Sequence, residues 1–142
     1  MITFLFFTSH FVNLDFALTV FINTNILGTV YALELCRKHN VKRFVYASTI
    51  YVNSIDGGFY RSSKKAAEDY IEEYKKIYDV NYTILRFGSL YGQRADDNNG
   101  VKKVIKNAIF TGQVSYDGNS NSIRKYINVL DAAKACADVL RN

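Results

Sequence analysis

The sequence predicts an α/β fold built on a parallel sheet. Two short apolar runs, Val41 to Thr49 and Val80 to Phe87, have the length and composition of buried strands. A long helical pattern separates these runs, and another helical pattern precedes the first. Because strands that alternate with helices of this length are typical of βαβ units, the two strands should lie parallel in one sheet.

Composition indicates one ordinary globular domain. The chain has 142 residues, of which 49% are hydrophobic, and a net charge of +5. The basic residues come as scattered pairs on polar helix faces, so we expect no nucleic-acid partner. Cys36 and Cys136 lie among apolar residues and are expected to be free thiols in a reducing, cytoplasmic compartment. Neither forms a Cys-x-x-Cys pair and His10 and His39 lie apart, so no metal site is expected.

The first 22 residues are unusually apolar and aromatic. We predict a buried strand from Ile2 to Phe7, followed by a loop and the start of a helix. The stretch lacks the basic start and the small-residue cleavage site of a signal peptide. Polar residues, His10 and Asp15 among them, interrupt it, so a membrane-spanning helix is not expected and we predict no membrane partner.

A helix is predicted from Asn25 to Asn40. One apolar row follows the helical period, and a second row beside it consists of Leu27, Tyr31 and Leu35. A helix that is apolar on two sides should be well buried. Asn25, at the start of this helix, is either a simple helix cap or a functional residue, and both interpretations stay open at this point.

A chemically consistent set of side chains gathers where the first strand ends. Ser48 and Thr49 place two hydroxyls at that end, and ligands of parallel sheets bind beyond the carboxyl ends of the strands. A short glycine-bearing loop follows, and a helix is predicted from Tyr60 to Tyr78. Tyr60 and Lys64 are four residues apart, so they share one face of this helix.

These residue types suit proton transfer to or from an alcohol. A free phenol has a pKa of about 10, and a cation ~4 Å away in a medium of effective dielectric near 20 is worth roughly 4 kcal/mol. Lys64 should therefore lower the pKa of Tyr60, while Thr49 holds and polarises a substrate oxygen. The alternative is a chance Tyr-x-x-x-Lys pair on a helix surface, but the preceding Ser-Thr strand end and glycine loop favour the functional interpretation.

The remaining elements follow from local patterns. We predict that acidic and basic residues form the solvent-exposed face of the Tyr60–Tyr78 helix, namely Glu68, Glu72, Glu73, Lys75 and Lys76. Beyond the second strand we predict a polar turn, an amphipathic helix capped by Gly112, a second turn, a short strand and a last helix. Their bounds are Asp96–Gly100, Val101–Phe110, Asp117–Ser120, Ile123–Ile127 and Asp131–Arg141.

Taken together, the motifs resemble the NAD-dependent epimerase/dehydratase family, the extended branch of the short-chain dehydrogenase/reductases that acts on nucleotide sugars. Tyr60 and Lys64 match its Y-x-x-x-K pair, and Thr49 matches its Ser/Thr. N-I-L-G-T at 25–29 is similar to its N-x-x-G-T. Two later stretches, L-R-F-G-S-L-Y-G-Q-R and R-K-Y-I-N-V-L-D, resemble its L-R-x-x-N-x-Y-G-P-R and R-x-Y-I-H-V-x-D.

The resemblance implies a partial Rossmann-like, doubly wound parallel sheet in a single incomplete domain over residues 1–142, with residues from about 88 to 128 starting a small substrate-binding region. It implies NAD as cofactor, with NADP not excluded, and a nucleotide sugar as substrate. The implied catalytic residues are Thr49, Tyr60 and Lys64. The implied cofactor contacts are Asn25, Ser48, Tyr60, Lys64, Phe87 and Gly88, and the implied substrate contacts are Thr49, Ser89 and Arg124.

Some positions differ from the family pattern. Serine at position 89 replaces the usual asparagine, and Ile50 and Tyr51 stand where dehydratases carry acidic residues, so an epimerase or simple oxidoreductase is favoured. The glycine-rich loop that cradles the cofactor pyrophosphate is not found, so we expect an interior piece with little activity alone. The alternative to an enzyme is a non-catalytic fragment that acts through a partner. A homodimer, or association with an N-terminal half, are the expected assemblies.

Overall fold

The computed structural model describes residues 3–6, 17–114 and 123–141. The chain divides into two compact units, one formed by Met1–Phe87 with Asp138–Asn142 and the other by Gly88–Ala137. The turn predicted at Asp117–Ser120 lies outside the described residues. The second unit begins at the residue where the resemblance places the start of the substrate-binding region, and that role remains a prediction.

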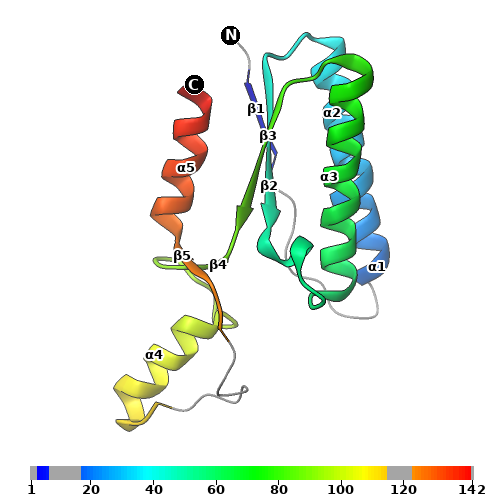
Figure 1. Cartoon of the computed structure of the whole chain (residues 1–142). Coiled ribbons are helices and arrows are strands. Elements are labelled where there is room, and N and C mark those ends of the chain that lie inside the picture. The colour runs from blue at the N-terminus through cyan, green and yellow to red at the C-terminus, as the bar shows by residue number, and fades with distance from the viewer. Residues whose placement is uncertain (1–2, 7–16, 115–122, 142) are drawn as a thin grey trace. The chain divides into compact units, whose positions relative to one another are not determined.

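The first unit contains a parallel sheet of three strands, in the order β1 (Thr3–Phe6), β2 (Arg43–Thr49) and β3 (Tyr82–Phe87) (Figure 1). In the register of β2 and β3, Ser48 lies opposite Arg86 and Thr49 lies opposite Phe87. The parallel α/β arrangement predicted from the sequence is therefore confirmed. Thr49 and Phe87 are neighbours at the carboxyl edge, which is the edge where parallel sheets bind ligands.

Two helical segments lie side by side on the same side of this sheet in Figure 1. The first is a continuous run of α1 (Ala17–Val20), a π-helical segment η1 (Phe21–Leu27) and α2 (Gly28–Lys38). The second is α3 (Gly58–Tyr78). The first run begins eight residues before the predicted start at Asn25, so the helix-cap interpretation of Asn25 is wrong.

The core of the first unit lies between the sheet and the helices. It includes Phe44 and Tyr46 of β2, Leu33 and Cys36 of α2, and Ala67 and Ile71 of α3. The prediction that α2 is buried on two sides is wrong, because the second row, Leu27, Tyr31 and Leu35, is 41%, 65% and 50% exposed. A sheet and one neighbouring helix cover only one side of α2 among the described residues.

Within the described residues, one helical run, Leu18–Lys38, is long and apolar enough to cross a membrane by length and composition. In the structure this run packs on α3 and includes two fully buried polar residues, Asn25 and Thr29. The Thr29 hydroxyl donates a hydrogen bond to the Asn25 carbonyl at 2.6 Å. The side of the Leu18–Lys38 run that carries Asn25 and Thr29 therefore belongs to the core of the α/β unit.

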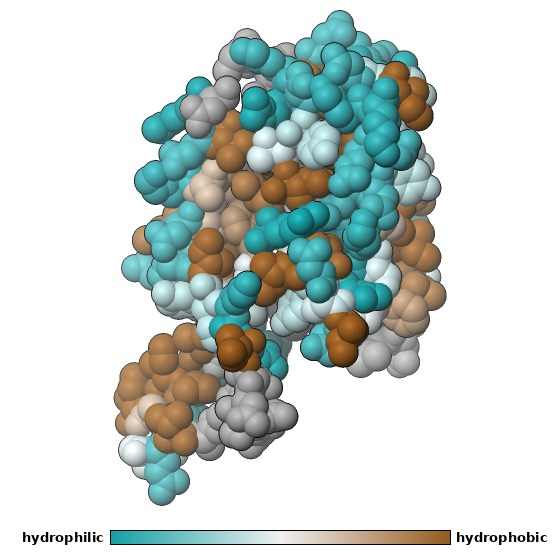
Figure 2. Space-filling view, viewed as in Figure 1, coloured by the Kyte–Doolittle hydropathy of each residue, from teal (hydrophilic) through white to brown (hydrophobic). Residues whose placement is uncertain are grey.

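The second unit pairs two short parallel strands, β4 (Ser89–Tyr91) and β5 (Tyr126–Asn128), and carries α4 (Gly100–Thr111) and the start of α5 (Val129–Arg141). The Asn99 side chain caps α4 by accepting from the Lys102 N–H at 3.1 Å, and Gly112 ends it at φ 70° as predicted. The predicted Ile123–Ile127 strand begins later, at Tyr126. α4 has an exposed apolar face (Figure 2), formed by Ile105, Ile109 and Phe110.

Candidate active site

Thr49 and Tyr60 meet at the carboxyl edge of the sheet. Thr49 is the last residue of β2, and its Oγ1 accepts a hydrogen bond from the Tyr51 N–H at 3.3 Å as the 3-10 helix η2 (Ile50–Asn53) begins. Tyr60 lies in the first turn of α3, and the Thr49 side chain lies close enough to its phenol to lower the pKa of that phenol. The two hydroxyls predicted to act on one substrate oxygen are therefore adjacent.

A tight return of the chain brings Tyr60 over the strand end. Gly57 precedes α3 with φ 99°, and a Cβ there would lie 3.0 Å from Arg61 Cβ and 3.3 Å from Tyr51 Cβ. Arg61 also donates from Nη1 to the Ser54 carbonyl at 2.8 Å, which closes the loop on itself. Glycine provides the left-handed backbone and the close approach that this short connection needs.

Lys64 lies one turn further along α3 and points at the same strand end. Its side chain is buried, and Nζ donates to the Ala47 carbonyl at 2.7 Å. Nζ lies 4.8 Å from the centre of the Tyr46 ring and 5.9 Å from that of the Tyr60 ring. The ammonium is thus held by a carbonyl dipole and by the aromatic faces of its neighbours.

The charge states differ from the prediction. Burial raises the pKa of Tyr60 to about 12, and the hydrogen bond from Thr49 only partly opposes this effect. Burial also lowers the pKa of Lys64 to about 8, against the attraction of the Glu68 carboxylate. The expected lowering of the Tyr60 pKa by Lys64 is therefore wrong for this arrangement, because desolvation disfavours charge on both groups and Nζ is directed at Ala47.

Asn25 supports Tyr60 from the π-helical segment. Its Nδ2 donates to Ser63 Oγ at 2.9 Å, and Ser63 Oγ donates in turn to the Tyr60 carbonyl at 2.9 Å. The Phe21 ring lies 5.8 Å from the Tyr60 ring, centre to centre. Segments of π-helix often occur at functional sites, because the wider turn redirects side chains.

Asn25 also carries the feature that best fits a bound cofactor. The residue is fully buried, and Oδ1 has no hydrogen-bond partner among the described residues. An unsatisfied buried acceptor is rare and costs free energy, so a donor from a ligand would compensate it. Asn25 and Lys64 could therefore hold a cofactor, with Phe87 beside Thr49 at the same edge. These cofactor contacts remain predictions.

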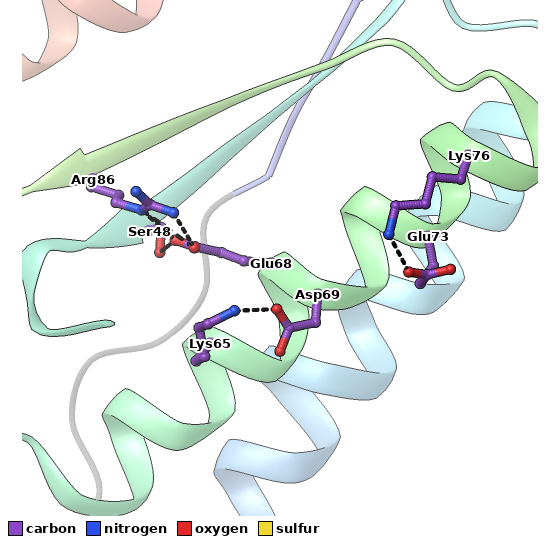
Figure 3. Close-up of polar contacts among 7 residues, drawn as sticks. All are labelled: Ser48, Lys65, Glu68, Asp69, Glu73, Lys76 and Arg86. Carbon is purple, nitrogen blue, oxygen red and sulfur yellow. Dashed lines mark hydrogen bonds and ion pairs between the residues drawn. The ribbon is translucent and has the colours of Figure 1, made fainter. Parts of the chain in front are cut away.

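An ionic cluster of Ser48, Glu68 and Arg86 joins α3 to β2 and β3, one residue before the ends of the two strands (Figure 3). The Glu68 carboxylate is fully buried, accepts from Ser48 Oγ at 2.5 Å, and accepts from Arg86 Nε at 3.0 Å and Nη2 at 2.7 Å. The prediction that Glu68 belongs to the exposed face of its helix is wrong, because α3 presents this position to β2 and β3. The spacing Tyr60, Lys64, Glu68 was the signal that could have revealed it, since these residues share one face.

Ser48 was predicted to contact the cofactor, and its hydroxyl is engaged by Glu68 in the structure. Ser89 and Arg124 belong to the second unit. The Ser89 N–H donates to the Lys125 carbonyl at 2.9 Å, so Ser89 lies beside the segment that carries the exposed Arg124. The cofactor role of Ser48 and the substrate roles of Ser89 and Arg124 remain predictions.

Gly88 has a structural reason to be glycine. A Cβ at this position would lie 2.5 Å from the Lys125 carbonyl oxygen, a distance that would force the backbone of the two segments apart. Close approach of the chains thus accounts for the residue type without a ligand. The predicted cofactor contact at Gly88 is neither supported nor opposed by this packing.

Comparison with known proteins gives a consistent result. The NAD dependent epimerase/dehydratase family matches residues 16–142. A putative UDP-glucose 4-epimerase of Methanocaldococcus jannaschii is 31% identical over 130 residues, covering 78% of this chain and 42% of the relative. A dTDP-D-glucose 4,6-dehydratase of Dictyostelium discoideum is 27% identical over 145 residues, covering 85% of this chain and 33% of the relative.

The fold is also shared with solved structures. A UDP-glucuronic acid 4-epimerase from Bacillus cereus, solved in complex with NAD, superposes with a TM-score of 0.81 at 19% identity, covering 98% of this chain and 49% of that one. The Rossmann-like fold implied by the sequence motifs is therefore confirmed. This chain spans less than half the length of each of these three proteins.

Proposed function

The chain belongs to the NAD-dependent epimerase/dehydratase family, and we propose that Thr49, Tyr60 and Lys64 move the proton of a sugar hydroxyl during NAD-dependent chemistry on a nucleotide sugar. The observation that carries this proposal is that Tyr60 and Lys64 of α3 converge on the end of β2: the Thr49 side chain lowers the pKa of the Tyr60 phenol, and the buried Lys64 donates to the Ala47 carbonyl at 2.7 Å. Ligands of parallel sheets bind at this edge.

NAD, or NADP, when bound, takes up a hydride from the sugar carbon and can return it. The chain's own residues handle the proton and the orientation of the substrate. Thr49 would donate to the substrate oxygen and fix it beside Tyr60. In its phenolate form Tyr60 would take the hydroxyl proton and become a phenol, and the phenol would return that proton in the reverse step. Because the pKa of Tyr60 is about 12, the phenol is protonated at neutral pH. Positive charge on Lys64 is therefore needed to make the phenolate accessible.

The cofactor contacts follow from the same geometry. Asn25 offers a buried acceptor that has no partner among the residues that the structure describes, and Lys64 offers a cation next to the catalytic phenol. Phe87, opposite Thr49 in the strand register, would form part of the wall beside the nicotinamide ring. Ser48, which precedes Thr49, and Gly88, which follows Phe87, would be further cofactor contacts. In the second unit, Ser89 and Arg124 would bind the substrate, since a guanidinium matches the geometry of a diphosphate.

An epimerase or a simple oxidoreductase is the preferred activity. Elimination of water would need an additional acid, and the residues directly after Thr49 are Ile50 and Tyr51. Isoleucine offers no proton, and a phenol is a weak acid at neutral pH. The relatives that match include both epimerases and dehydratases, so this preference comes from the chain's own residues.

Location and assembly belong to the same proposal. Cys36 and Cys136 are free and buried, which is consistent with a reducing, cytoplasmic compartment. A homodimer, or association with a companion half, is the proposed assembly. The alternative function is a non-catalytic chain that acts only through such a partner.

The proposal is tested by titrating the purified, folded chain with NAD and with UDP- and dTDP-sugars by calorimetry, and by assaying turnover. We expect Tyr60→Phe to retain the fold and to lose at least a hundredfold in any turnover, in line with the loss of a general acid–base group. Tyr70→Phe is the matched control, since Tyr70 lies on the same helix and is 47% exposed. Absence of NAD binding by the folded chain would contradict the enzyme proposal and favour the alternative.

A further inference from the structure

The Glu68 carboxylate is the most completely engaged charge in the described part of the chain. It is fully buried and accepts from Ser48 on β2 and from Arg86 on β3. Ser48 lies opposite Arg86 in the strand register, so one carboxylate spans the ends of both strands. Burial of an ion is costly unless it is paired and hydrogen-bonded, and the contacts to Glu68 meet that condition.

This cluster is built into the candidate active site. Lys64 and Glu68 lie one helical turn apart on α3 and contact consecutive residues of β2, Lys64 through the Ala47 carbonyl at 2.7 Å and Glu68 through the Ser48 hydroxyl at 2.5 Å. The next residue of β2 is Thr49, whose side chain lowers the pKa of the Tyr60 phenol. The register of α3 against β2 is therefore pinned at the two residues that precede Thr49.

We propose that Glu68 is a positioning residue of this site, which locks α3 onto the ends of β2 and β3 and provides the negative charge that keeps Lys64 cationic. The proposal rests on the proposed function, because it assigns Glu68 a role in the proton transfer by Tyr60. It assigns no contact of Glu68 with substrate or cofactor. Arg86 has the opposite effect on Lys64, since its guanidinium partly neutralises the Glu68 carboxylate.

The electrostatic surroundings of Lys64 support this role. From its own helix, Lys64 faces Glu68 and the Tyr60 phenol, and from β2 it faces the Tyr46 ring. On β3, Arg86 pairs with the Glu68 carboxylate and so weakens the attraction between that carboxylate and Lys64. The neighbouring segment η1 has no charged residue in its sequence. Glu68 opposes the effect of burial on the pKa of Lys64. The Ala47 carbonyl and the two aromatic rings offset part of the cost of burying the ammonium, and the Glu68 carboxylate adds a full negative charge from the same helix.

Two substitutions separate this role from simple packing. Glu68→Gln keeps the shape and removes the negative charge, so the pKa of Lys64 should fall by about one unit, as expected for loss of an opposite charge one helical turn away. Arg86→Gln removes the neutralising cation and leaves the carboxylate, so the pKa of Lys64 should rise by about half a unit. Ser48→Ala removes a neutral hydroxyl and serves as the control for shape, with little effect on that pKa.

The measurement is the titration of the Lys64 Cε resonance in the full chain labelled with 13C-lysine, assigned by its loss in Lys64→Arg. Far-UV circular dichroism verifies that each variant is folded. Shifts in opposite directions for Glu68→Gln and Arg86→Gln support the proposal. Equal shifts, or shifts in the same direction, overturn it, because a purely structural role would perturb the site in the same way in both variants.

Arg86→Gln tests the role of Glu68 even where Glu68→Gln does not fold. Should Glu68→Gln fail to fold, the upward shift in Arg86→Gln is still the test, since the Arg86 side chain is 41% exposed and tolerates replacement more readily. The titration uses neither cofactor nor substrate. A chain that binds no NAD would contradict the proposed function while leaving the Lys64 result interpretable, and an unchanged Lys64 pKa would overturn this inference alone.

Discussion

Replacement of Lys64 by methionine should stabilise the folded chain at neutral pH. The pKa of Lys64 drops from 10.5 to about 8 on folding, which corresponds to about 3 kcal/mol because each pKa unit is worth about 1.4 kcal/mol. Folding must meet this cost wherever Lys64 is protonated. Methionine fills a similar volume without the charge, but loses the bond to the Ala47 carbonyl, worth about 1 kcal/mol. The expected net gain at pH 7 is about 2 kcal/mol.

The stability advantage of Lys64→Met over the unaltered chain should decrease as the pH rises. Between pH 8 and 10.5 the unfolded Lys64 keeps its proton and the folded Lys64 loses it, so the unfolded state binds more protons. Stability of the unaltered chain relative to Lys64→Met should therefore rise with pH across this window. Burial raises the pKa of Cys36 to about 11 and that of Tyr60 to about 12, which lowers stability at high pH in both proteins. The comparison between the two proteins removes these shared contributions.

The assay is urea unfolding followed by far-UV circular dichroism at pH 7, 8, 9 and 10. Lys65→Met is the matched control, since the Lys65 side chain is 49% exposed and pairs with Asp69 at the surface. We expect the difference between Lys64→Met and the unaltered chain to shrink steadily with pH, and the Lys65→Met difference to stay nearly constant. A Lys64→Met protein that is less stable at every pH, by a constant amount, would refute the reasoning.

Two further predictions concern packing and the catalytic phenol. Gly88→Ala should destabilise the pairing of β4 with β5 by more than about 2 kcal/mol, because the new Cβ would lie 2.5 Å from the Lys125 carbonyl oxygen. Gly100→Ala is the control and should be neutral or stabilising, because a Cβ there meets no atom within 4 Å. Amide hydrogen exchange of β4 and β5 distinguishes the two variants. Equal protection of these strands in both variants would contradict the expected clash at Gly88. Thr49→Val should raise the pKa of Tyr60 further, since the Thr49 hydrogen bond lowers it. The 13Cζ resonance of Tyr60 reports that titration, and an unchanged or lower pKa would show that the hydrogen bond does not act as described.

The elements defined by local pattern were predictable from the sequence. The apolar run of β2 and the glycine-free helix after Tyr60 define a strand and a helix with bounds close to those observed, Arg43–Thr49 and Gly58–Tyr78. The adjacency of Thr49 and Tyr60 followed from the parallel strand order together with the short loop. Such features depend on residues close in sequence, where periodicity and turn chemistry are informative.

The predictions that are wrong concern burial, which depends on the elements that cover each helix face. Glu68 was placed on the wet face because it is charged, but Ser48 and Arg86 compensate its burial from two strands that lie 18 to 20 residues away in sequence. The row Leu27, Tyr31 and Leu35 was expected to be buried because it is apolar, but it is exposed. The pKa of Tyr60 was misjudged because the pattern reveals the nearby cation and not the depth of burial that opposes it.

The central claim is that Thr49, Tyr60 and Lys64 form the site at which NAD and substrate react. Its most direct test is a titration of the full chain, labelled with 13Cζ-tyrosine and 13Cε-lysine, with NAD followed by NMR. We expect saturable shifts of the Tyr60 and Lys64 resonances, with those of Tyr70 and Lys65 unmoved. Saturable binding of NAD that leaves Tyr60 and Lys64 unmoved would contradict it.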